Sequence, residues 1–275
     1  TMLASRLRGL LPPLSNDEAL ESAAILSLVN SDTLQKQWKQ RPFRSPHHSA
    51  SLTAMVGGGS IPAPGEISLA HNGILFLDEL PEFPRSVLEV LRQPLEDREV
   101  HISRVNASFV YPSDFILIAA MNPCPCGYLG DPGGRCRCTP EQIQRYRAKL
   151  SGPLLDRIDL HLTVARESTS LLASSQAGES SAQIAARVSQ ARQRQLARQG
   201  CANAFLDLPG LQQHCRLPET DRLWLEQACE RLNLSLRAAH RLLKVARTLA
   251  DLEGASEIGR AHLAEALQYR PSSGI

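Results

Sequence analysis

Two adjacent acids follow a short apolar run in the first half of the chain. The string GILFLDEL places Asp78 and Glu79 directly after residues 73–77. A continuous apolar run of this length is typical of a strand buried on both faces of a parallel sheet. At the end of such a strand, one carboxylate can hold Mg²⁺ through its water shell and the next can polarise a water that attacks a phosphate. The same string also fits a strand that ends in solvated acids.

A second apolar run, residues 115–121, ends in Asn122. Open α/β sheets gather their ligand groups at the carboxyl ends of neighbouring strands. We therefore expect the Asn122 amide to lie near Asp78 and Glu79 and to orient a water against a phosphate. An asparagine in this position is also a common turn residue.

Two arginines add further candidates. Arg157 lies in the string LLDRIDL, and its guanidinium can stabilise charge on a phosphate held by a neighbouring subunit, although an ion-paired surface arginine fits equally. Arg237 begins a predicted helix, where positive charge opposes the helix dipole, so that a bound anion would relieve the conflict. A solvated basic face is the alternative. The same helix carries more basic residues, namely His240, Arg241, Lys244 and Arg247.

Four of the seven cysteines form two CxC pairs, Cys124 with Cys126 and Cys136 with Cys138. They lie on a Gly- and Pro-rich loop, and four thiolates can close a tetrahedral Zn²⁺ site that would supply the loop with folding energy. Redox-sensitive or simply reduced thiols remain the alternatives. The other cysteines are expected to pack as small apolar residues in the second half of the chain, and they are Cys201, Cys215 and Cys229.

Basic residues cluster on a predicted β-hairpin of two alternating runs, residues 100–105 and 108–111. Arg98, His101 and Arg104 could contact nucleic-acid phosphates, or be ordinary solvated charges. The preceding segment adds further basic groups to the same hypothesis, namely Arg41, Arg44 and the pair His47-His48, for which we expect a loop or DNA-facing role and not metal ligation.

The elements that position these residues follow from local patterns. Strands are expected at 73–77 and 115–121, and helices at 1–10, 16–30, 84–95 and from Thr139. The stretch 41–65, rich in Pro, Gly, Ser and His, is expected to be one long loop or insertion. Residues 167–183 read as a linker, and helices are expected at 184–199, 219–232, 236–252 and 259–269. The pattern predicts an α/β core over 1–166 and a small helical domain over 184–275.

Composition limits the class of protein. The chain has 275 residues, is 43% apolar and carries a net charge of +2, so any DNA contact must come from local basic clusters. No apolar run reaches the roughly 18 residues of a membrane span, and the first residues lack a signal-peptide pattern. We expect a cytoplasmic protein whose thiols are reduced or bind metal.

Several of these strings occur in an order that resembles ComM-type proteins, which are bacterial AAA+ ATPases related to the I subunit of magnesium chelatase. The resemblance covers nearly the whole chain. It is carried by RPFRSPHHSAS (41–51), VGGGSIPAPGEISLAHNGILFLDELPEF (56–83), LRQPLEDREVHISR (91–104), AAMNPCPCG (119–127), LLDRIDLH (154–161) and RAAHRLLKVARTLADL (237–252).

The resemblance implies a role for each candidate. Asp78 and Glu79 would form the Walker B pair, Asn122 sensor 1, Arg157 the arginine finger and Arg237 sensor 2. The hairpin would be the pre-sensor-1 hairpin, and the Gly-rich stretch near 56–60 would belong to the helix-2 insertion.

The same resemblance concerns the beginning of the chain. Family members carry GxxGxGK[ST] followed by Met-Leu, so Thr1 before Met2-Leu3 matches the last P-loop position. The expected fold is therefore an AAA+ P-loop NTPase core without its first strand and P-loop, followed by a helical lid. A chain without that loop is expected to bind ATP weakly or not at all, because the loop cradles the phosphates.

Three functions follow from the sequence. The resemblance implies an ATP- and Mg²⁺-dependent hexameric DNA helicase that promotes branch migration in natural transformation and recombination. A magnesium-chelatase-type motor subunit that remodels a protein partner is the second. The third is a non-catalytic binding or assembly module stabilised by zinc. ATPase activity that does not depend on DNA would favour the second, and zinc binding without nucleotide binding the third.

Overall fold

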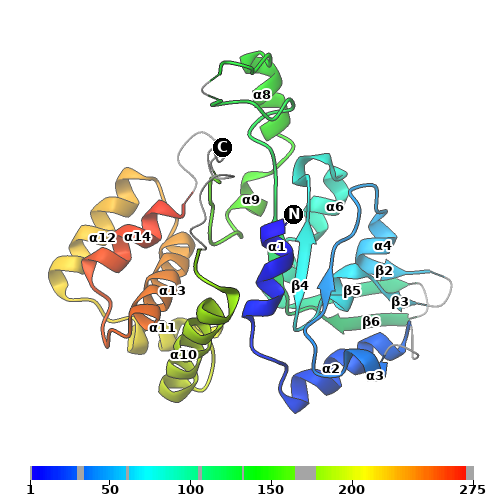
Figure 1. The fold of residues 1–275 in the computed structure, drawn as a ribbon, viewed down its shortest axis with the longest axis horizontal. Helices are drawn as coiled ribbons and strands as arrows, with labels where there is room; N and C mark the ends of the chain where they lie inside the picture. The colour runs from blue at the N-terminus through cyan, green and yellow to red at the C-terminus, as the bar shows by residue number, and fades with distance from the viewer. Residues whose placement is uncertain are drawn as a thin grey trace. The chain divides into compact units, whose positions relative to one another are not determined.

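The structure is a computed structural model that describes residues 2–29, 34–59, 62–104, 107–131, 133–164 and 178–270 (Figure 1). It consists of two compact units, Thr1–Arg157 and Ile158–Ile275. The linker expected over 167–183 falls mostly outside the described residues, since 165–177 are not described.

A parallel three-stranded sheet forms the centre of the first unit. Its strands are β1 (Phe43–Arg44), β4 (Ile74–Leu77) and β7 (Ile116–Ala119), in the order β1-β4-β7. Ile74 lies opposite Ile116, and Leu77 lies opposite Ala119. With its flanking helices and the helical second unit, this sheet confirms the predicted fold class of an AAA+ core followed by a helical lid.

Every residue of β4 is buried, as expected for the central strand of such a sheet. Side chains alternate between the two faces of a strand. Leu75 and Leu77 accordingly join the larger core, whereas Ile74 and Phe76 pack in a smaller cluster with Ala4 of α1. The apolar run that precedes Asp78 is therefore packed on both faces of the sheet, and this packing holds the two acids in place.

Short helices surround the sheet. Their bounds are α1 (Met2–Leu7), η1 (Arg8–Leu10), α2 (Asn16–Ser27), α3 (Leu34–Gln37), α4 (Leu52–Val56), α5 (Glu66–Leu69), η2 (Leu80–Glu82), α6 (Arg85–Val90), α7 (Pro94–Asp97), α8 (Pro140–Arg147) and α9 (Gly152–Leu155). Capping boxes start α2 at Ser15 and α8 at Thr139, which satisfies helix N–H groups that have no partner within the helix.

The prediction of one helix over residues 84–95 was wrong. The structure has two, because α6 ends at Val90 and α7 begins at Pro94. Proline has no N–H to donate, and its ring clashes with the carbonyl four residues earlier, which is that of Val90. Pro94 instead occupies the first turn of the next helix, where the missing N–H costs nothing.

The Gly-rich stretch 41–65 is more ordered than the single loop we expected. It contains β1, α4 and an antiparallel pair of β2 (Gly57–Gly58) with β3 (Ala63–Pro64). Gly57 has φ of 104°, and a Cβ there would lie 2.4 Å from the Ala63 carbonyl oxygen. The close approach of the two short strands therefore requires a residue without a side chain.

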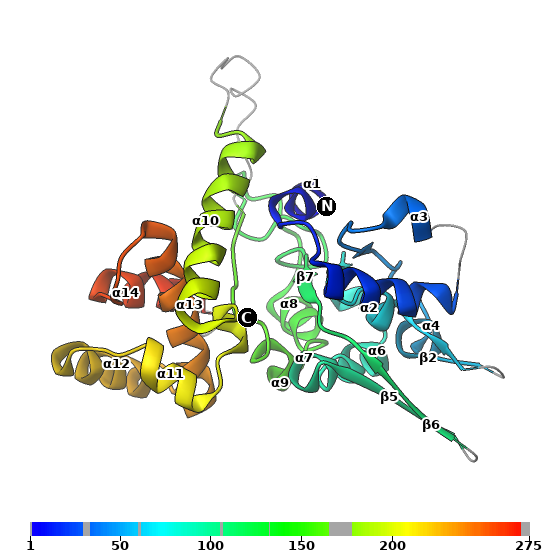
Figure 2. The same ribbon diagram turned by 90° about the horizontal axis from the view of Figure 1, so that it is seen from below.

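The predicted hairpin is confirmed as β5 (Glu99–Arg104) paired antiparallel with β6 (Ala107–Pro112). Val100 and Ile102 are buried on its inner face, and Ile102 lies opposite Phe109. Figure 2 shows the hairpin running outward from the rest of the first unit. The alternation leaves His101, opposite Val110, on the outer face.

The described part of the second unit contains helices and no strand. The helices are α10 (Ser181–Gln199), η4 (Asn203–Phe205), α11 (Leu208–His214), α12 (Glu219–Arg231), α13 (Leu236–Glu253) and α14 (Arg260–Gln268). All four predicted helices are present, and α11 was missed. Cys215 is buried in the core of this unit, and Cys201 and Cys229 pack against that core, as predicted. In the described residues, every helix is too short or too polar to cross a membrane.

Candidate functional site

The paired acids and Asn122 emerge at the same edge of the sheet. The backbone N–H of Ala120 donates to the Leu77 carbonyl at 2.9 Å, and that of Leu80 donates to the Ala120 carbonyl at 2.9 Å. These bonds continue the β4–β7 pairing past the strand ends. Asp78, Glu79 and Asn122 therefore leave the sheet side by side, at the edge where α/β folds bind ligands.

Glu79 has an uncommon backbone conformation for a residue with a side chain. Its φ of 53° and ψ of 47° lie in the left-handed region, and its N–H donates to Asp78 Oδ1 at 3.0 Å. Left-handed backbone costs a non-glycine residue roughly 1–2 kcal/mol. The Glu79 side chain is 56% exposed beside the half-buried Asp78. Strain of this kind at an exposed acid is a feature of functional sites.

His48 contacts Glu79 directly, which sequence reasoning missed. Its Nδ1 lies 3.3 Å from Glu79 Oε2. The centre of the His47 ring lies 4.0 Å from that of the His48 ring. The Phe83 ring meets the His48 ring edge-on, with 6.5 Å between the two ring centres. The segment after β1 reaches Glu79 because β1 pairs in parallel with β4. No local sequence signal records that pairing, which is why the histidines were assigned a loop or DNA-facing role.

Tyr146 of α8 is a second contact that the sequence did not reveal. Its side chain is buried near the backbone of Asn122. Burial, together with the charge of Glu82, raises the pKa of Tyr146. Lys149 lies 5.7 Å from the centre of the Tyr146 ring and forms a 3.3 Å ion pair with Glu82. This ion pair links the end of α8 to the turn that follows Glu79.

The four loop cysteines converge, as a shared metal site requires. Their Sγ atoms all lie within 4.8 Å of one another. Cys124 Sγ is 3.4 Å from that of Cys126 and 3.8 Å from that of Cys136, and Cys126 and Cys136 are 3.6 Å apart. Backbone hydrogen bonds from Tyr128 and Arg137 lower the pKa of Cys126 to about 6. The thiolate of Cys126, the form that binds metal, is therefore accessible near neutral pH, whereas burial and hydrogen bonds with the neighbouring thiols raise the pKa of Cys136 and Cys138.

Arg157 is engaged within its own unit. Its Nη2 lies 2.6 Å from Glu96 Oε2 and its Nη1 donates to the Pro153 carbonyl at 2.6 Å, with 13% of the side chain exposed. Neither partner is a predicted site residue. This geometry matches the ion-paired alternative of the sequence analysis, and a role toward a neighbouring subunit requires that the Glu96 contact be exchanged.

Arg237 lies exposed in the first turn of α13, whose cap is the Ser235 side chain. It belongs to the second unit. The basic series of this helix does not form a single solvated face. Arg247 is only 2% exposed and forms a 3.0 Å pair with the buried Asp251. Arg241 pairs with Asp159 at 3.4 Å.

Two of the candidate hairpin residues lie beside acids. Arg98 lies at the base of β5, with Nε 3.9 Å from Asp114 Oδ1, and His101 Nε2 lies 3.5 Å from Glu99 Oε2. Both side chains remain 42% exposed. Arg104 belongs to β5, but its side chain lies outside the described residues, as does the whole of Thr1.

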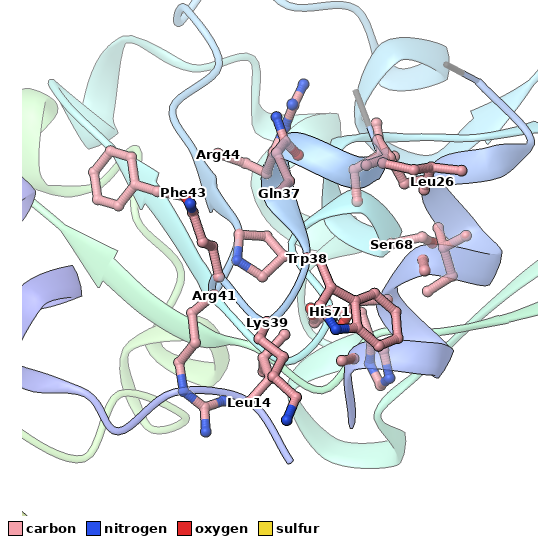
Figure 3. Close-up of a pocket in the computed structure, with 18 of the residues that line it drawn as sticks. Leu14, Leu26, Gln37, Trp38, Lys39, Arg41, Phe43, Arg44, Ser68 and His71 are labelled. Carbon is pink, nitrogen blue, oxygen red and sulfur yellow. Dashed lines mark hydrogen bonds between the residues drawn. The ribbon is translucent and has the colours of Figure 1, made fainter. Parts of the chain in front are cut away.

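A separate hollow of about 120 Å³ lies among α2, α3, β1 and α5 (Figure 3). Arg41 lines it and pairs with Glu18 at 3.3 Å, and Arg44 pairs with Glu66 at 2.6 Å. The hydrogen bond to Glu66 raises the pKa of Arg44. Both arginines expected to face DNA therefore form ion pairs within the unit. None of the candidate nucleotide or metal residues lines this hollow.

Comparison with known families identifies the fold around this edge. A family model described as magnesium chelatase, subunit ChlI, matches residues 1–172, and one described as its C-terminal region matches residues 178–270. The chain belongs to the magnesium chelatase ChlI family. The ChlI-family matches cover both the sheet and the helical second unit, so the resemblance to ComM-type, magnesium-chelatase-like AAA+ proteins is confirmed.

Similar proteins occur in several bacteria. The chain is 59% identical to the uncharacterized protein YifB of Escherichia coli, 53% identical to the competence protein ComM of Haemophilus influenzae and 44% identical to the uncharacterized protein Rv2897c of Mycobacterium tuberculosis. Each match covers 98% of this chain but only 53–54% of the relative. The chain thus spans about half the length of these ChlI-family relatives.

Proposed function

We propose that this chain is part of an ATP-hydrolysing AAA+ motor whose catalytic edge is formed by Asp78, Glu79 and Asn122. The observation that supports the proposal is that the β4–β7 pairing continues past the strand ends, so that two acids and an amide follow at the edge where α/β sheets commonly bind ligands. Membership of the ChlI family supports it.

We assign a different role to each of these three residues. One half-buried carboxylate, Asp78, suits Mg²⁺, which keeps most of its waters and binds proteins through one or two carboxylates. The exposed Glu79 carboxylate accepts a proton from the attacking water, and the Asn122 amide orients that water. We assign Arg157 to a neighbouring subunit's phosphate, Arg237 to sensing the nucleotide, and Thr1 to the last position of a P-loop.

We propose DNA as the track of this motor and a homo-hexameric ring as its assembly, acting in the cytoplasm in branch migration during natural transformation and recombination. The protein named competence protein ComM supports the pathway. The exposed Arg98 and His101 on the projecting hairpin support the DNA contact.

We also propose Zn²⁺ as the metal of the four cysteines. With Zn–S bonds of about 2.3 Å, the edge of a ZnS₄ tetrahedron is roughly 3.8 Å. The Sγ separations of 3.4, 3.6 and 3.8 Å approach that edge. The bound ion would hold together a loop whose described residues form no helix or strand.

A chelatase-type motor is the second candidate, favoured by the match of both parts of the chain to family models of magnesium chelatase subunit ChlI. It differs from a DNA motor in one observable, because its ATPase activity requires no DNA. A zinc-stabilised module without catalysis is the third candidate, and it predicts zinc binding with no nucleotide binding even when a P-loop is present.

The deciding experiment compares this chain with a version extended before Thr1 by a strand and the P-loop consensus GxxGxGK, here called the P-loop-extended chain. Titration with a fluorescent ATP analogue and Mg²⁺ should give binding in the extended chain. Glu79→Gln should keep that binding and lower kcat about 10²–10⁴-fold, because the general base is removed. Absence of binding in the extended chain would contradict the motor and favour the zinc module.

A further inference from the structure

A second hollow, called here the basic hollow, lies between the cysteine-bearing loop of residues 122–139 and helix α8. It has a volume of about 520 Å³ and opens widely to solvent. Its walls come from both ends of the loop, from α8 and the residues just after it, and from Glu82 of η2. Figure 1 shows α8 projecting away from the sheet of the first unit. The basic hollow is therefore accessible to a large partner.

Positive charge dominates the walls of the basic hollow. Among the described residues that line it, Arg137, Arg145 and Lys149 are basic and exposed, and Glu82 is acidic. Lys149 pairs with Glu82 at 3.3 Å, so the two arginines supply the excess charge. Residues 122–150 contain five basic and two acidic residues, although the whole chain has a net charge of only +2. The hollow thus lies in a local positive field that attracts anions.

The two arginines reach the basic hollow from different elements. Arg145 follows Gln142 by three residues on α8, so both side chains lie on the helix face that lines the hollow. Arg137 lies between Cys136 and Cys138, whose Sγ atoms belong to the converging cluster of thiols. Positive groups on two separate walls suit an extended anion with several charges better than a single small one.

The same loop carries an exposed aromatic residue. Tyr128 follows Cys126, which lines the hollow, by two residues, so that their Cα atoms lie within about 7 Å of each other. The guanidinium of Arg135 lies over the Tyr128 ring, 4.7 Å from the ring centre, and Asp131 holds it there through a 2.6 Å ion pair. Tyr128 is 38% exposed and the Arg135 side chain is 50% exposed. Aromatic rings and guanidinium planes of this kind are surfaces on which nucleobases stack.

We propose that the basic hollow binds a single-stranded nucleic acid, with Arg137 and Arg145 on its phosphates and the Tyr128–Arg135 pair stacked against a base. Basic walls next to an exposed ring are the combination by which proteins hold single strands without reading their sequence. An acidic peptide would use the charge but not the ring. The inference rests on the DNA-binding part of the proposed function, to which it adds a second surface, and it requires no ATP hydrolysis.

The first test measures how this chain binds a fluorescently labelled oligothymidylate, by fluorescence anisotropy at several salt concentrations. Arg137→Gln combined with Arg145→Gln should weaken binding about tenfold at low salt. The slope of log K against log salt should fall by about 1.4, because two phosphate contacts worth about 0.7 each are lost. Arg6→Gln combined with Arg8→Gln removes the same charge from two exposed arginines of the first unit and should leave the slope unchanged.

The second test separates stacking from charge. Tyr128→Leu should weaken binding of the oligothymidylate about tenfold and leave the salt slope unchanged, because it removes a ring and no charge. Polyglutamate, added as a competitor at the same total charge, should displace the oligothymidylate poorly, because it offers no base to stack.

Three results would overturn the inference. The first is an unmodified chain that binds no oligothymidylate. The second is unchanged binding when Arg137 and Arg145 are both replaced; if replacing the hairpin residues Arg98 and His101 then weakens binding, the DNA contact of the proposed function stands and only the basic hollow is excluded. The third is efficient displacement by polyglutamate together with unchanged binding in Tyr128→Leu, which would assign the hollow to an acidic protein.

Discussion

Glu79 and Arg157 present their charges in opposite ways. Glu79 is exposed on left-handed backbone next to Asp78, whereas Arg157 is mostly covered and bound to Glu96. An exposed carboxylate is available to a water molecule at once. The Arg157 guanidinium must first leave its own ion pair before it can stabilise a phosphate on another subunit, so the two residues make different predictions for mutation.

Arg157→Ala in the P-loop-extended chain should lower kcat about 10³–10⁵-fold if Arg157 acts as an arginine finger. Glu96→Gln is the matched control, because it breaks the same ion pair but leaves the guanidinium. It should destabilise the protein by a similar amount and keep turnover. Steady-state ATPase rates and thermal unfolding measure both variants. Equal losses of turnover in the two variants would mean that Arg157 is only a structural ion-pair partner.

At the scale of elements, the second unit is held by a polar network as well as by its apolar core. Asp251 of α13 is 1% exposed. It forms ion pairs with Arg198 of α10 at 2.5 Å and with Arg247 at 3.0 Å. Asn203 of η4 donates to it at 2.8 Å. Burial alone would raise the pKa of Asp251, but the hydrogen bonds from Arg198 and Asn203 and the charge of Arg247 lower it.

Asp251→Asn should therefore destabilise this unit by about 3–5 kcal/mol, because it leaves two arginines without their buried partner. Asp221→Asn, which removes an ion pair to the more exposed Arg260, should cost about 0–1 kcal/mol. Urea unfolding followed by circular dichroism measures both variants. A loss for Asp251→Asn no larger than that for Asp221→Asn would contradict the network's role.

The same network has a defined pH dependence. Because the folded-state pKa of Asp251 is lowered, its stabilisation is fully present above the unfolded-state pKa of about 4. The stabilisation is lost as pH falls through the lower, folded-state value. The stability difference between the original chain and Asp251→Asn should therefore be constant near neutral pH and shrink below about pH 4. Unfolding midpoints measured across this range test it, and a difference that grows toward acid would contradict it.

At the scale of the whole molecule, the small net charge of +2 leaves any DNA contact to local groups. The projecting hairpin offers Arg98 and His101, each near an acid. This arrangement predicts a modest number of phosphate contacts, and hence a moderate dependence of DNA affinity on salt.

Arg98→Asn combined with His101→Ala should weaken single-stranded DNA binding by the P-loop-extended chain and reduce the slope of log K against log salt by about 1–2. Asparagine is chosen because Arg98 has φ of 59°, which asparagine tolerates. Arg187→Ala, an exposed arginine of the second unit, is the control. Fluorescence anisotropy at several salt concentrations measures the slopes, and unchanged slopes would remove the hairpin from the DNA interface.

Much of the site was predictable because it depends on local pattern. The buried run before Asp78 and Glu79, the strand before Asn122, the hairpin and the paired CxC spacing are all readable from the order of residues. The structure adds that the four thiols converge. The predicted helix over 84–95 failed at Pro94, although the breaking residue was visible in the sequence.

Only the tertiary structure decided the contacts between residues that lie far apart in the chain. His48 meets Glu79 because β1 pairs with β4, Lys149 meets Glu82 across 67 residues, and Arg157 meets Glu96 across 61 residues. Such contacts leave no periodic signal, since each depends on strand order and loop closure. The sequence alone determined which chemical groups this protein carries and on which elements they lie. Their partners were determined by packing.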